Sequence, residues 1–148
     1  MGTYDTLNDV LVNLFRDINS IEENAITSSE FGDLTNNDMH VIEAIGIDEP
    51  KNMSTIARAL SVTVGTLTIS MNSLVKKGYV TRCRSTQDRR VVHISLSEKG
   101  VKAYYHHKHC HEQMIQGVVE VLTEEELHAL IKALTKLNSW FRIFGKDE

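Results

Sequence analysis

The chain has 148 residues, the size of one ordinary domain that can bury a core of its own. Its 41% hydrophobic content, one Pro and eight Gly exclude collagen-like and low-complexity chains. No window reaches 18 consecutive apolar residues and no basic segment with an apolar run opens the chain, so we expect neither a spanning helix nor a secretory signal. Two cysteines, Cys83 and Cys110, exclude a disulfide framework and favour a reduced, cytoplasmic protein without a membrane partner.

The net charge of −4 hides an uneven distribution. Residues 51–108 hold eleven Lys and Arg against two acids, Asp88 and Glu98, which makes this segment +9 and the rest of the chain −13. A basic middle between acidic ends can present a face for a polyanion despite a pI near 6. Charge alone fits a solvated basic surface equally well.

Residues 4–25 carry apolar side chains at alternating spacings of three and four, which predicts a helix with a narrow apolar seam that needs a partner helix. Thr35 begins a second helix that runs to about Gly46, and the segment around Pro50 breaks it. The seam of the first helix consists of Tyr4, Leu7, Leu11, Leu14, Ile18, Ile21 and Ala25.

Residues 53–78 predict two short helices joined by a turn. Ser54 is the expected cap of the first, and Thr63 of the second. Gly78 is expected to end the second helix. The residues expected to face inward are Ile56, Ala57 and Leu60 in the first helix and Val64, Leu67, Met71 and Leu74 in the second.

Residues 79–84 and 90–96 are strand-like runs separated by a polar turn, which predicts a hairpin. Ser97 begins a helix that runs to about residue 122. Thr123 and Glu126 form a capping box for a last helix, whose broad apolar face spans residues 127–144.

A helix-turn-helix followed by a basic hairpin predicts a winged helix whose second helix enters the major groove of DNA. Its outward face has short hydrogen-bonding side chains and one terminal cation, which suits close approach to base edges and phosphates. An ordinary polar helical hairpin is the alternative. The residues of this segment assigned to DNA contacts are Thr63, Gly65, Thr66, Thr68, Ile69, Asn72, Ser73 and Lys76.

The hairpin supplies a cluster of arginines that includes Arg82 and the assigned DNA contacts Arg84, Arg89 and Arg90. Such a loop reaches the minor groove, where negative potential attracts Arg. Asp88 is assigned to the same site, because a carboxylate two residues before Arg90 can pair with that guanidinium and fix its direction.

The run Thr63–Val80, the wing sequence Asp88-Arg-Arg90 and the run Leu96–Gly100 resemble the MarR family of winged helix repressors. Val-Thr-x-Gly-Thr, Lys-Lys-Gly-Tyr and Gln-Asp-Arg-Arg-Val-Val-His also resemble its FabT branch, the repressors of bacterial fatty-acid synthesis genes. The resemblance implies a mainly α fold with a small β-hairpin wing, in one domain over residues 1–148. A winged helix-turn-helix core would span 35–96, and dimerisation helices 4–28 and 97–144.

The resemblance also implies a homodimer on a near-palindromic double-stranded DNA operator. The sequence points the same way, because the apolar faces of residues 4–25 and 127–144 are larger than a small winged helix core can cover. Packing of the two faces on each other within one chain is the alternative.

Residues 106–111 are rich in His and contain Cys110, which suggests either zinc ligands or hydrogen-bonded histidines that line a pocket. A helix places His107, Cys110 and His111 on one face and the other histidines opposite, which favours the pocket and no metal. A redox switch at Cys83, between two arginines, is a weaker alternative. The residues assigned to ligand binding are Tyr104, His107, His111 and Met114.

These observations favour a dimeric DNA-binding regulator and not an enzyme, since no nucleophile elbow or phosphate-binding glycine loop is present. The FabT resemblance implies an effector without a cofactor: an acyl chain delivered on acyl carrier protein as corepressor. The acidic carrier could dock on Arg16, Lys102 and Lys108. A filled core without a ligand cavity, a zinc-responsive repressor and a winged helix adaptor that does not bind DNA are the alternatives.

Overall fold

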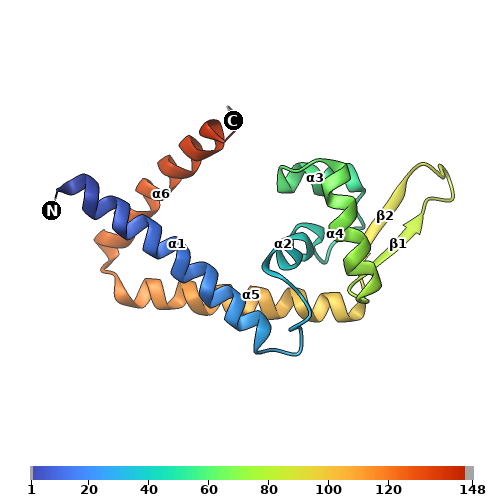
Figure 1. Ribbon diagram of the computed structural model, residues 1–148, viewed down its shortest axis with the longest axis horizontal. Coiled ribbons are helices and arrows are strands. Elements are labelled where there is room, and N and C mark those ends of the chain that lie inside the picture. Colours follow the sequence, from blue (N-terminus) through green and yellow to red (C-terminus); the bar gives the residue numbers. More distant parts are fainter. Residues whose placement is uncertain (1, 146–148) are drawn as a thin grey trace. The chain divides into compact units, whose positions relative to one another are not determined.

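The computed structural model describes residues 2–145 (Figure 1). It divides into two compact units, Met1–Cys110 and His111–Glu148, with the boundary inside one long helix. The elements are mainly helical, with a two-stranded antiparallel sheet, as predicted. In chain order they are α1 (Thr3–Thr27), α2 (Asn36–Ile45), α3 (Met53–Leu60), α4 (Val64–Lys76), β1 (Val80–Arg84), β2 (Val92–Leu96), α5 (Glu98–Val121) and α6 (Glu124–Phe144).

Side-chain caps begin most of the helices. Thr35 and Thr123 each form a capping box with an acid three residues later, and the hydroxyl of Thr63 accepts a hydrogen bond from the N–H of Thr66. The prediction that Ser54 caps α3 is wrong. Asn52 does so, because its Oδ1 accepts from the N–H of Thr55 at 2.8 Å.

The core of the first unit lies among α2, α3, α4 and the sheet. The inward positions of α3 and α4 were predicted correctly, except that Val64 is 45% exposed because it begins the first turn of α4. Leu60 is half-buried at the core's edge. The fully buried larger side chains are Tyr79, Met39, Ile42, Ile45, Ile56, Leu67, Met71, Leu74 and Ile94.

The hairpin is shorter than predicted at both strand starts, because Tyr79 turns into the core and the N–H of Val91 donates to the carbonyl of Asp88 within the turn. Its register pairs Arg82 with Ile94. Ile94 also exchanges two backbone hydrogen bonds with Lys51, which ties the segment before α3 to β2.

Tyr79 joins four parts of the first unit. Its hydroxyl donates to Asp33 Oδ1 at 2.6 Å, its carbonyl accepts from the N–H of Ser97, and the ammonium of Lys99 lies 4.3 Å from its ring centroid. Burial, followed by the hydrogen bond and charge of Asp33, raises the pKa of Tyr79 well above its usual range. The loop before α2, the end of α4, β1 and the start of α5 therefore meet at one residue.

The two ends of the chain carry apolar side chains that are exposed. None of residues 124–144 is buried, and α1 buries only Ile26. None of the helices within residues 2–145 is long and apolar enough to cross a membrane. The larger exposed apolar residues of α1 are Tyr4, Leu7, Val10, Val12, Leu14, Phe15 and Ile21, and those of α6 are Ile131, Leu134, Leu137, Trp140, Phe141, Ile143 and Phe144.

We predict that Gly100→Ala strongly destabilises the protein. A Cβ at Gly100 would lie 2.1 Å from the carbonyl oxygen of Tyr79, which is backbone and cannot move without displacing the start of β1. Gly117→Ala, in the same helix, is the matched control, since its Cβ would meet nothing within 4 Å among the described atoms outside the helix's own backbone. Chemical denaturation should show a loss for Gly100→Ala and a gain of up to about 1 kcal/mol for Gly117→Ala. Equal stabilities would contradict the close contact.

Candidate nucleic-acid interface

The outward face of α4 is built from short polar side chains. Gly65, Thr66, Asn72 and Lys76 are exposed as predicted, and Ile69 is 75% exposed. Such an apolar side chain in an otherwise polar face suits contact with a thymine methyl group. This face combines apolar contact, hydrogen bonding and one cation at the helix end.

Two of the assigned residues lie partly inside. Thr68 and Ser73 are half-buried, and the hydroxyl of Thr68 donates to the carbonyl of Val64 at 2.8 Å. Thr68 also lines a cavity of about 350 Å³ with Met53, Arg82, Arg84 and Val92. Thr68 therefore lies at the edge between α4 and the sheet.

The wing fixes its arginines through local hydrogen bonds. Arg90 Nε and Nη2 donate to the two carboxylate oxygens of Asp88 at 3.2 and 3.3 Å, and the N–H of Arg90 donates to Oδ1 at 3.0 Å. This is the fork predicted from the sequence. The Arg90 side chain and N–H hold the pKa of Asp88 below its usual range, and Arg90 itself is 91% exposed. The guanidinium of Arg90 is therefore held in one orientation while it stays exposed to a ligand.

The remainder of the turn is also ordered by polar contacts. The hydroxyl of Ser85 accepts from the N–H groups of Gln87 and Asp88, and Arg84 Nη1 donates to the carbonyl of Arg89 at 3.4 Å. Arg84 and Arg89 are both exposed. The wing thus presents three guanidinium groups from one compact loop.

Sequence reasoning missed a contact between the wing and α4. Arg82 Nη2 donates to Asn72 Oδ1, so a strand residue holds a residue of the helix face. Arg82 pairs with the buried Ile94, and paired residues share one face of a sheet, so Arg82 lies on the face toward the helices. The alternation of side chains along the two strands could have predicted that Arg82 lies on this face. No local motif, however, identifies Asn72 as its partner.

The histidine run is divided among different contacts. His107 is buried with Nε2 3.2 Å from Glu43 Oε2, and His106 Nε2 lies 3.1 Å from the carbonyl oxygen of Ala25. His106 also lies 3.8 Å from Cys110 Sγ, so these two share a face, contrary to the prediction. Within residues 2–145, no group of three or more His, Cys, Asp or Glu side chains is placed to hold a metal.

The residues assigned to ligand binding fall in both units. Tyr104 packs against the core of the first unit and His107 is buried there, whereas His111 and Met114 belong to the second unit and are half-buried. A shared site for these four residues stays a prediction.

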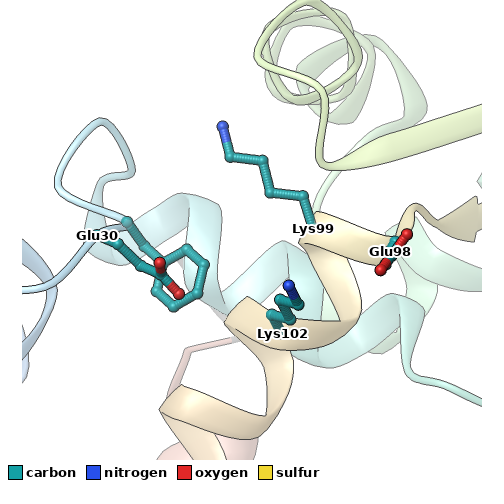
Figure 2. A pocket seen from close by; sticks show the side chains of 5 residues that line it. Glu30, Glu98, Lys99 and Lys102 are labelled. Atoms are coloured by element: carbon teal, nitrogen blue, oxygen red, sulfur yellow. The ribbon is translucent and has the colours of Figure 1, made fainter.

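A pocket of about 420 Å³ lies between the loop before α2 and the first turns of α5. Glu30 and Phe31 come from the loop, and Glu98, Lys99 and Lys102 come from α5 (Figure 2). Its charged groups have both signs, and Phe31 supplies an aromatic surface.

A capped helix with a short polar outer face, braced by a second helix and followed by an arginine-bearing hairpin, defines a winged helix DNA-binding protein. The MarR family model matches residues 34–92. The chain belongs to the MarR family of DNA-binding transcriptional regulators.

Two relatives, one found by structure and one by sequence, span nearly the whole chain, and a third matches about half of it. The structure is similar to that of Streptococcus pneumoniae FabT in complex with DNA, with a TM-score of 0.90, 37% identity, and coverage of 95% of this chain and 99% of that one. The transcriptional regulator YpoP of Bacillus subtilis is 29% identical over 91% of this chain and 92% of its own. SarZ of Staphylococcus saprophyticus is 43% identical, over about half of each chain (46% and 47%).

We predict that Arg90→Ala weakens binding to operator and random duplex alike, by about 1–3 kcal/mol and with a shallower salt dependence, because a wing arginine contacts phosphate or the minor groove. Asp88→Ala should cause part of the same loss by releasing Arg90. Fluorescence anisotropy with labelled duplexes measures both effects.

The sign of the change in DNA affinity on Asp88→Ala decides whether Asp88 orients Arg90. Removing a negative charge would by itself tighten binding to DNA. Asp88→Asn, which keeps an oxygen for the N–H of Arg90, is the control for loop shape. Unchanged or tighter binding by Asp88→Ala would show that Asp88 does not orient Arg90.

Proposed function

We propose that this protein is a homodimeric repressor of fatty-acid synthesis genes, and that an acyl chain on acyl carrier protein is its corepressor. The observation that carries the proposal is the similarity to FabT at 37% identity and a TM-score of 0.90 over nearly both whole chains. The three motifs that resemble the FabT branch agree with it, and they lie in or next to the recognition helix and in the wing.

The exposed apolar surfaces support the homodimer. Soluble monomers rarely expose large contiguous apolar patches, and α1 and α6 each carry seven larger apolar side chains in the open. A second copy would cover such faces and place two recognition helices about one turn of DNA apart, on a near-palindromic operator.

The surroundings of α5 support an acylated carrier as the effector. Lys102 and Lys108 are exposed on α5, and Arg16 is exposed on α1, so each is open to an acidic protein. Tyr104 and His107 are polar residues assigned to the ligand, and Met114 is a flexible apolar side chain of the kind that accommodates an alkyl chain. An amphipathic ligand matches this combination.

Operator affinity tests the proposal directly. We expect it to rise with acyl carrier protein that bears a long acyl chain, and to stay unchanged with the unacylated carrier or with zinc. Lys102→Ala together with Lys108→Ala should reduce the response, whereas Lys132→Ala in α6 is the matched control for loss of a surface charge. Electrophoretic mobility shift or anisotropy titrations measure the response.

Two results would contradict the proposal. A rise with zinc alone that His107→Ala abolishes would assign the site to a metal. Equal operator affinity in all three conditions would remove the acylated carrier as corepressor while leaving the DNA-binding activity in place.

A further inference from the structure

The hydrogen bond between Arg82 and Asn72 joins the wing to the outward face of the recognition helix. Arg82 lies on β1 and Asn72 in the middle of α4, ten residues earlier in the chain. Both side chains are exposed, so the bond forms at the surface that would meet DNA. The contact therefore affects what Asn72 can offer to a base.

The partner of Asn72 determines which way its amide points. A guanidinium has five N–H donors and no acceptor, so only the amide oxygen of Asn72 can face Arg82. The amide NH₂ is left as the outward group. Asn72 therefore has its oxygen turned toward Arg82 and its two hydrogen-bond donors turned outward.

This orientation changes the base edge that Asn72 can recognise. A free Asn pairs with adenine through two bonds, one donated to N7 and one accepted from the N6 amino group. Because the bond to Arg82 draws Oδ1 toward the wing, the amide is turned away from the orientation in which Oδ1 and Nδ2 both face the adenine edge, and the second bond is disfavoured. Guanine presents two adjacent acceptors, N7 and O6, in the major groove and suits a donor-only side chain.

Thr66, six residues earlier on the same helix, is arranged in a similar way. The hydroxyl of Thr63 accepts from the N–H of Thr66 at 3.1 Å and donates to the hydroxyl of Thr66 at 2.9 Å. The hydroxyl hydrogen of Thr66 is then available to donate outward. Two polar residues of the outward face are therefore both set as donors by neighbours within the protein.

We propose that Arg82 is a positioning residue for DNA specificity, which holds Asn72 so that it favours guanine and disfavours adenine at one operator position. The proposal rests on the role of α4 as the recognition helix. It assigns to Arg82 an effect on base preference in addition to any contact of its charge with phosphate.

Selection from randomised duplexes, followed by affinity measurements on single-base variants, tests the proposal. Asn72→Ala should flatten the preference at one position, by about five- to tenfold, because one hydrogen bond is lost. The parent should favour guanine at that position. Arg82→Met, which keeps an aliphatic stem without charge or donors, should raise the adenine-to-guanine ratio there by about tenfold, because the free amide regains both of its bonds.

Arg84→Met is the matched control. It removes the same charge from the same strand and the same face, but the hydrogen bond of Arg84 goes to the carbonyl of Arg89 and not to a side chain of α4. It should lower affinity for all sequences without changing base preference. Arg82→Met added to Asn72→Ala should likewise lower affinity only, and thermal unfolding of each variant checks that the fold is kept.

The outcomes distinguish the role of Arg82 from the DNA-binding function itself. An adenine preference in the parent at the Asn72 position, or an unchanged preference in Arg82→Met, would overturn the role of Arg82 while leaving DNA binding intact. A parent protein that binds no duplex would instead contradict the DNA-binding function on which the proposal rests.

Discussion

The junction at Tyr79 is the constraint on which the DNA-binding unit depends. Its buried ring, its hydroxyl bond to Asp33 and its carbonyl, which accepts from Ser97 and lies against Gly100, hold the end of α4, the start of the wing and the start of α5 together. Because α4 ends three residues before Tyr79 and β1 begins one residue after it, the spacing of the recognition helix and the wing is determined there. A recognition helix and a wing need such a fixed spacing if they are to contact adjacent grooves of DNA.

Polar contacts at the surface then set the directions of individual side chains. Asp88 orients Arg90, Thr63 both caps α4 and bonds the hydroxyl of Thr66, and Arg82 holds Asn72. These contacts lie at the surface, and the exposed Asp88–Arg90 ion pair adds little to the stability of the fold. Their effect is to limit the conformations in which each group meets DNA, which lowers the entropy lost on binding.

Features encoded by neighbouring residues could be predicted from the sequence. The caps at Thr63 and Thr123 and the Asp88–Arg90 fork depend on spacings of two or three residues, and all three are present. The sequence did not distinguish Asn52 from Ser54 as the cap of α3, because both are good capping residues and they lie two positions apart. The Arg82–Asn72 contact could not be predicted, since it depends on how the sheet packs against α4. The close approach at Gly100 depends in the same way on tertiary packing.

The central claim is that the recognition helix and the wing form a DNA-binding surface whose affinity comes largely from phosphate contacts. The most direct test is the affinity for random duplex DNA as a function of salt concentration. A protein that makes about six or more phosphate contacts should lose roughly a thousandfold in affinity between about 50 and 200 mM salt, because each contact releases condensed counterions. Binding that stays constant over this range would contradict the account.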